Sequence, residues 1–155
     1  MMKAASLWQP WATLIALGEK RIETRGRRIN HRGELAVHAA QRWLPAQSTM
    51  LDQDPFRSVL GEHGISSGNA VQSNMPRGEF VGQVNVVDEV ALVPADFQIG
   101  RFEGFFGRYG PGRRGYLLTN IRRLHTPVLC RGLQAMPFTV PPDVEEMVRE
   151  QLEAR

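Results

Sequence analysis

Glycine and proline divide this chain into short apolar segments, and that division limits the folds open to it. The 155 residues include 15 glycines and 10 prolines. No apolar run approaches the ~18–20 residues of a membrane-spanning helix. A chain of about 150 residues can still bury ~68–70% of its unfolded surface, and 42% of its residues are apolar. We therefore expect one globular domain over residues 1–155 that does not enter a membrane.

Six of the short segments have the apolar pattern of strands, and the last of them is a short pairing element. They are residues 2–7, 20–25, 34–40, 79–93, 115–124 and 126–136. Gly82 indicates a bulge or bend within the fourth. In the second, strict alternation places Ile22 and Thr24 on one face and Arg21, Glu23 and Arg25 on the other.

Short helices are predicted between the strands and at the end of the chain. Pro10 and Gly18 bound the first, and 54–61 forms another. Asp143, with Glu146 as a reciprocal cap, starts a C-terminal helix. Residues 64–77 and 102–114 are expected to be irregular. Because strands and helices do not alternate regularly, we predict an α+β fold, a small mixed barrel of five to six strands with flanking helices.

Charge gives the first indication of function. The net charge is +3, and 17 of the 19 basic residues are arginine. Arginine binds phosphate and stacks on bases, so nucleic acid is one candidate partner. A GC-rich genome, which replaces lysine by arginine, is the alternative explanation. The N-terminal segment does not resemble a signal peptide, and a cytoplasmic protein is expected.

Motifs for several kinds of chemistry are absent from the sequence. There is no GxxxxGK[ST] loop, no GxGxxG after a strand and no GxSxG elbow. The four histidines have no metal-ligand spacing, and the single cysteine, Cys130, excludes an internal disulfide. We therefore expect no metal and no cofactor. The oligomeric state is left open, and a monomer is allowed.

The densest cluster of functional side chains is GEKRIETR at residues 18–25. Lys20 could act as a base if it were desolvated, with an adjacent glutamate to orient it. Glu23 and Arg25, on one strand face, could form an ion pair. The alternative is a solvated edge strand with alternating charges and no function.

This cluster and its neighbours resemble the ASCH domain, the family named for homology to activating signal cointegrator-1. The matching blocks are SLWQPWA at 6–12, GEKRIETR at 18–25, RGELAVHAA at 32–40, GQV at 82–84, and blocks between 107 and 134. They cover almost the whole chain in order. The chain departs from the family after Arg25, where an aromatic is usual, and in the closing block, which lacks its tryptophan.

The resemblance implies a PUA-like fold and a cleft between the first helix and the GxKxxExR strand, which takes nucleic acid or a nucleoside. Some small relatives are amidohydrolases that act on N4-acetylcytidine, and others have been proposed as ribonucleases. In the amidohydrolases a threonine follows the lysine by three positions. Here Glu23 stands at that spacing from Lys20, and Thr24 faces the other way.

Two functional hypotheses follow, and a third is a purely structural domain. In the first, the chain binds single-stranded RNA or a modified nucleoside. Its binding residues would be Trp8, Gln9, Lys20, Glu23, Arg25, Arg27, Arg28, Arg32, His38 and Trp43. In the second, the same cleft is a hydrolase, an amidohydrolase or a ribonuclease, with Lys20, Glu23 and Arg25 as its catalytic residues.

Overall fold

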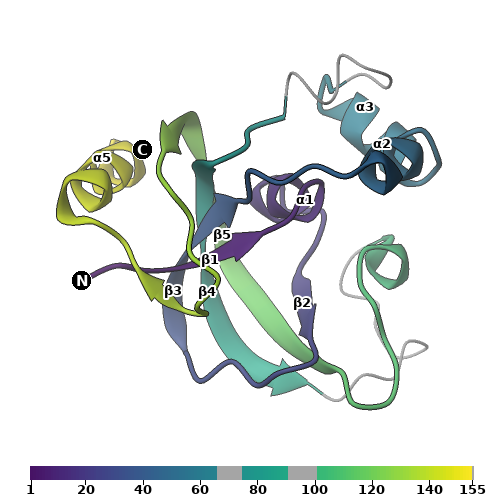
Figure 1. The fold of residues 1–155 in the computed structure, drawn as a ribbon, viewed down its shortest axis with the longest axis horizontal. Helices are drawn as coiled ribbons and strands as arrows, with labels where there is room; N and C mark the ends of the chain where they lie inside the picture. Colours follow the sequence, from purple (N-terminus) through teal and green to yellow (C-terminus); the bar gives the residue numbers. More distant parts are fainter. Residues whose placement is uncertain (66–74, 91–100, 155) are drawn as a thin grey trace.

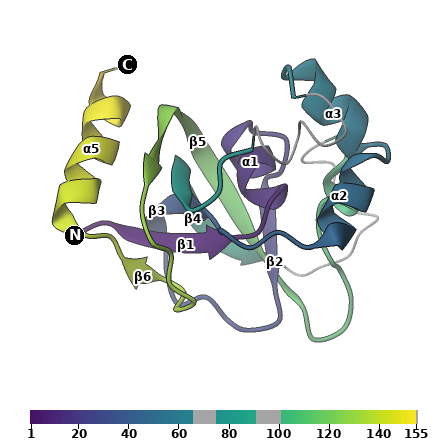
Figure 2. The same cartoon turned by 45° about the horizontal axis from the view of Figure 1, so that its top comes forward.

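The computed structural model describes residues 1–65, 75–90 and 101–154. The strands are β1 (Lys3–Leu7), β2 (Ile22–Arg25), β3 (Gly33–Ala39), β4 (Glu79–Val90), β5 (Arg114–Leu129) and β6 (Phe138–Thr139). The helices are α1 (Trp11–Ala16), α2 (Pro45–Leu51), α3 (Phe56–Glu62), the 3-10 turn η2 (Glu103–Phe105) and α5 (Pro142–Glu153). In Figures 1 and 2, α5 lies at one end of the molecule and α2 and α3 at the other, with the sheet and α1 between them.

All six strands join one mixed sheet in the order β2-β5-β4-β3-β1-β6. Only β1 and β3 pair in parallel, and the other pairs are antiparallel. The outermost strands, β2 and β6, have four and two residues. They are not paired with each other, so the described sheet is open. The predicted α+β fold is confirmed, and the six strands lie within the five to six expected. The expected barrel is not confirmed, because the end strands of the described sheet do not pair and the sheet is not closed.

Alternation along the central strands divides the core between the two faces of the sheet. On β3, Leu35 and Val37 pack with residues of α1, whereas Ala36 between them packs with residues of α5. On β1, the same alternation places Ala5 in the core on the α1 side of the sheet and Ala4 in the core on the α5 side. Because even-numbered residues of β1 and β3 share the face covered by α5, Ser6 and His38 lie on that face too.

Gly82 lies at an irregularity of the sheet where neighbouring backbone comes close. Between Phe80 and Gly82, the register of β4 shifts against β5. The pairs Val37–Gly82 and His38–Phe80 show the same shift against β3. A Cβ atom at Gly82 would lie 2.8 Å from the carbonyl oxygen of Arg122, so no larger residue fits without movement. The bulge predicted at Gly82 is confirmed.

Several predicted boundaries were wrong. Strand β2 begins at Ile22, because the N–H groups of Glu19 and Lys20 still bond to the carbonyl of Leu14 at the end of α1. Strand β5 continues to Leu129 and absorbs part of the element expected at 126–136. Helix α2 was not predicted. Residues 91–93 of the expected fourth strand, and most of the 64–77 loop, lie outside the described residues.

The C-terminal helix is present, but it is not capped as predicted. Its first residue is Pro142, which has no N–H to be capped, and the described caps include no side-chain bond from Asp143. A different acidic residue of the first turn, Glu145, accepts the N–H of Met2 at 2.8 Å. That bond ties α5 to the start of β1. Among the described residues, no helix is long and apolar enough to cross a membrane.

Candidate ligand-binding clefts

The turn from β1 into α1 is fixed by a buried glutamine. Gln9 follows Trp8 and forms a cis peptide bond with Pro10. Its side chain is fully buried. The Gln9 Oε1 accepts the N–H of Thr13 at 3.0 Å, and the Nε2 donates to Thr13 Oγ1 and to the Pro76 carbonyl, both at 2.8 Å. Because both polar atoms of the Gln9 side chain are already bonded, the residue positions Trp8 and Trp11 and does not itself face a cleft.

Trp8 and Trp11 line a cleft of about 420 Å³ against strand β2, which we call the β2 cleft. Its lining residues are Ser6, Leu7, Trp8, Trp11, Glu23, Arg25, Gln134, Ala135 and Met136. Trp11 is half-buried in the wall of this cleft. The cleft lies where the resemblance implied, between the first helix and the GxKxxExR strand. The loop before β6 forms its remaining wall.

Glu23 and Arg25 form an ion pair in this cleft, with 3.3 Å between Arg25 Nε and Glu23 Oε1. Both side chains are half-buried, while Ile22 and Thr24 are buried on the opposite face, as predicted from alternation. The Thr24 hydroxyl accepts the N–H of Arg108 at 3.2 Å. The cleft therefore presents a carboxylate and a guanidinium, and the threonine hydroxyl faces away from it.

Lys20 lies behind the cleft and does not line it. Its side chain is 1% exposed, and its Nζ donates to the carbonyl of Ile22. Burial lowers the pKa of Lys20 below its usual value, and the carboxylates of Glu23 and Glu103 oppose that shift. Lys20 can therefore act on a ligand only through its electrostatic effect on Glu23.

Glu103 and Tyr109 belong to the same cluster and were missed at the sequence level. The fully buried Glu103 carboxylate accepts the N–H of Ile22 at 2.8 Å and that of Arg21 at 3.0 Å. The Tyr109 hydroxyl donates to the Glu103 carbonyl at 2.9 Å. Burial, with Glu103 and Glu23 nearby, raises the pKa of Tyr109. Tyr109 belongs to a family-like block, but no sequence signal links Glu103 to a strand some 80 residues earlier.

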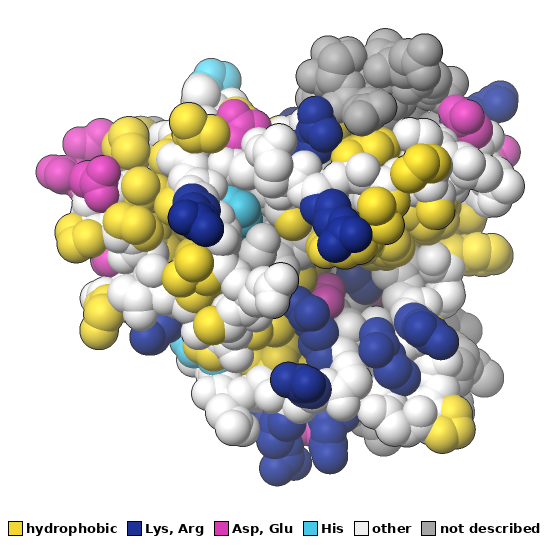
Figure 3. Space-filling model, viewed as in Figure 1, with side chains coloured by type: hydrophobic (Ala, Val, Ile, Leu, Met, Phe, Trp, Pro, Cys, Tyr) yellow, Lys and Arg dark blue, Asp and Glu magenta, His cyan; other side chains and the backbone are white. Residues whose placement is uncertain are grey.

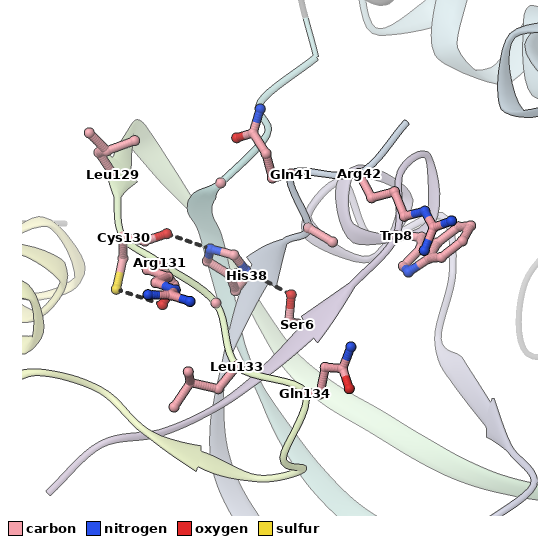
Figure 4. Close-up of a pocket in the computed structure, with 13 residues that line it drawn as sticks. Ser6, Trp8, His38, Gln41, Arg42, Leu129, Cys130, Arg131, Leu133 and Gln134 are labelled. Carbon is pink, nitrogen blue, oxygen red and sulfur yellow. Dashed lines mark hydrogen bonds between the residues drawn. The ribbon is translucent and has the colours of Figure 1, made fainter. Parts of the chain in front are cut away.

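A second cavity, of about 640 Å³, surrounds His38, and we call it the His38 cavity (Figure 4). Its lining residues are Ser6, Trp8, His38, Ala40, Gln41, Arg42, Gly78, Leu129, Cys130, Arg131, Gly132, Leu133 and Gln134. Like the β2 cleft, it is bounded by the chain that precedes β6. Trp8, which is 40% exposed, belongs to both.

The imidazole of His38 forms the floor of this cavity. Its Nε2 lies 2.8 Å from the carbonyl oxygen of Cys130, and its Nδ1 lies 2.9 Å from Ser6 Oγ. A carbonyl can only accept, so Nε2 carries the proton and Nδ1 accepts the hydroxyl of Ser6. Burial lowers the pKa of His38, which favours this neutral form.

The remaining predicted binding residues do not line either cavity. Arg27 and Arg28 are exposed, and Arg28 pairs with Glu89 at 3.3 Å. Arg32 bonds to the carbonyl of His31 at 2.8 Å. Trp43 packs against a core cluster beside α2 and α3 and donates to Ser48 Oγ at 2.8 Å. In Figure 3, basic side chains gather over β2 and the loops at its lower end.

In the part of the chain that the structure describes, no group of three histidine, cysteine or acidic side chains could hold a metal ion.

Comparisons with known proteins agree with this fold. A family model described as the ASCH domain matches residues 6–99. A crystal structure of ASCH from Zymomonas mobilis is similar, with 13% identity, a TM-score of 0.54, and coverage of 96% of this chain and 94% of that one. A structure of a single-residue mutant of that protein has 12% identity, a TM-score of 0.51 and 96% coverage of each chain. At these identities the likeness shows the fold alone. No curated protein matches.

Proposed function

The chain belongs to the ASCH domain family, and from that premise we propose that it binds single-stranded RNA or a modified nucleoside in the β2 cleft. One observation carries the proposal: the exposed Trp8 and the Glu23–Arg25 ion pair line the same cleft. An aromatic face is a stacking surface for any base. The carboxylate accepts hydrogen bonds from an amino or hydroxyl group, and the guanidinium donates to a carbonyl or phosphate oxygen.

The charge around the cleft supports a polyanionic ligand. Arg27 and Arg28 follow Arg25 after one glycine, Gly26, and are exposed. Single-stranded RNA can place a base against a tryptophan while cationic side chains follow its backbone. A duplex keeps its bases stacked and offers none to Trp8. We therefore expect the chain to bind single-stranded RNA or DNA more tightly than duplex DNA.

The experiment is fluorescence anisotropy of the whole chain with labelled single-stranded RNA, single-stranded DNA and duplex DNA across a salt series. We expect saturable binding whose log affinity falls linearly with log salt concentration. Trp8→Ala should weaken it by roughly 5- to 160-fold, since stacking contributes ~1–3 kcal/mol per base. Phe105→Ala removes another exposed aromatic, one that lies outside the cleft and is even more exposed than Trp8, and is the matched control. Absence of binding by the wild type, or equal losses in both variants, would refute the proposal.

A hydrolase in the same cleft is the second candidate, and the buried Lys20 is the observation that favours it. Its ammonium lies near Glu23, whose carboxylate faces the cleft. A carboxylate held beside a desolvated lysine can serve as a general base towards water. The probes of the binding experiment are therefore checked for cleavage, and N4-acetylcytidine for deacetylation. Turnover that is lost in Glu23→Gln with affinity retained would support the hydrolase, and intact substrates with the wild type would refute it.

A further inference from the structure

The β2 cleft and the His38 cavity are two parts of one groove. Ser6, Trp8 and Gln134 line both of them. Their volumes, about 420 and 640 Å³, each lie within the ~300–1,000 Å³ typical of small-molecule sites. A ligand that occupies the β2 cleft alone would therefore leave an adjoining cavity of at least equal size, on the other side of Trp8, unfilled.

The two parts of the groove differ in charge. In the β2 cleft the carboxylate of Glu23 and the guanidinium of Arg25 form an ion pair, whereas the described residues that line the His38 cavity include no aspartate or glutamate. The charged side chains of that cavity are Arg42 and Arg131. Figure 4 shows them on opposite sides of His38 and Ser6. A phosphate group is attracted more strongly by two guanidinium groups that have no carboxylate partner than by one that a carboxylate already neutralises, so the His38 cavity is the part that better suits an anion.

Neither of these two arginines is neutralised by the described part of the protein. The described ion pairs use other arginines and leave Arg42 and Arg131 without a carboxylate. The guanidinium of Arg42 lies over the indole of Trp8, with 5.6 Å between its Cζ and the ring centroid. That contact holds one cation at the boundary between the two parts of the groove.

The floor of the cavity is neutral and already bonded. Both ring nitrogens of His38 have partners within the protein, and the pKa of His38 is lowered. A ligand would therefore contact the positive charge of the cavity at the rim and not at the floor. The side-chain amides of Gln41 and Gln134 add neutral donors there.

We propose that the His38 cavity binds the phosphate of a nucleotide, between Arg42 and Arg131, while the base or nucleoside of the same ligand occupies the β2 cleft across Trp8. This inference rests on the proposed function and extends it. It predicts that the smallest ligand bound with full affinity carries a phosphate, as a mononucleotide or as the linkage of a dinucleotide. A free nucleoside would fill only the β2 cleft.

The test compares each ribonucleoside with its 3′- and 5′-monophosphate as competitors of a labelled RNA hexamer. For one of the two monophosphates we expect affinity at least roughly tenfold above that of the nucleoside, because charge-assisted contacts from two arginines are added. The double variant Arg42→Gln/Arg131→Gln should lose that difference and keep nucleoside affinity. The double variant Arg57→Gln/Arg149→Gln, which removes the same net charge away from the groove, should behave as the wild type.

The hexamer itself gives a second readout. Loss of the one phosphate contact shared by Arg42 and Arg131 should reduce the slope of log affinity against log salt by about 0.7, the value per phosphate neutralised on a single strand. Nucleosides and monophosphates that compete equally, or an Arg42→Gln/Arg131→Gln slope equal to that of the control variant, would overturn the phosphate site and leave the proposed function standing. A hexamer that does not bind the wild type at all would overturn both.

Discussion

Gly132 lies directly against the imidazole of His38. A Cβ atom at this position would stand 2.5 Å from His38 Cε1, 2.6 Å from His38 Nδ1 and 2.9 Å from Ser6 Oγ. The ring cannot swing aside without breaking its bonds to Ser6 and Cys130. The lack of a side chain at Gly132 is therefore what allows the loop after β5 to close over the floor of the cavity.

Gly132→Ala should destabilise the protein by about 1–3 kcal/mol, the usual cost of adding volume to a filled site. The measurement is urea unfolding. Gly61→Ala is the matched control: a Cβ there meets nothing within 4 Å, and a helical Gly→Ala change commonly stabilises by ~0.4–1 kcal/mol. If both variants lost the same amount of unfolding free energy, Gly132 would not be tightly packed.

His38 makes stability depend on pH. Its pKa is lowered from 6.5 by burial, so the unfolded chain binds more protons than the folded chain between the two pKa values. The contribution of His38 to stability is then fully present above pH ~6.5 and is lost as the pH falls through the folded pKa.

Urea unfolding at several pH values between about 7 and 5 should thus show falling stability in the wild type. His38→Gln should flatten that slope, whatever its stability at pH 7. His125→Gln changes an exposed histidine on β5 and should leave the slope as it is. A slope that persists in His38→Gln would assign the titration to another group.

We expect Lys20 to stabilise the folded protein as well as to act electrostatically on Glu23. Lys20→Met removes a buried ammonium and leaves Glu23 and Glu103 without it, which typically costs ~3–5 kcal/mol. The readout is the urea midpoint. Arg27→Ala, which removes an exposed cation from the following loop, should leave the midpoint unchanged. If Lys20→Met were as stable as the wild type, the cluster around Glu23 would not depend on this charge.

Glu103 fastens the chain before β5 to the start of β2. Glu103→Gln replaces a carboxylate that accepts N–H groups of Arg21 and Ile22, and hydrogen bonds to charged groups contribute ~1.5–3 kcal/mol. We expect a loss of that size and faster hydrogen exchange at those two amides. Glu153→Gln, exposed on α5, is the control. Unchanged exchange at Ile22 would contradict this role.

Local patterns in the sequence predicted the features that depend on neighbouring residues. Alternation placed Glu23 and Arg25 on one face of β2, and the glycine in a valine-rich strand predicted the bulge at Gly82. The same alternation puts Lys20 on the face of Ile22 and Thr24, and the structure buries it there. Its assignment to the cleft came from the chemistry of lysine and from the family resemblance, and not from the strand period.

Helix α2 shows why other elements were missed. Its sequence, PAQSTML, has no apolar stripe, and only Gln47 and Leu51 are buried. The helix is held by a tertiary bond, in which Gln47 Nε2 donates to the carbonyl of Gln9 at 2.6 Å. The helix propensity of seven residues gives no information about a hydrogen-bond partner 38 positions away in the sequence.

The sequence by itself determined the family blocks, most strands and the two faces of β2, because each follows from residue type and short-range period. Only the tertiary structure decided which distant residues meet. It brings Glu103 to Ile22, His38 to Cys130, and Trp8 to the boundary of two cavities. The physical reason is that strand order and packing bring these groups together through contacts 80 or more residues apart, which a local pattern cannot encode.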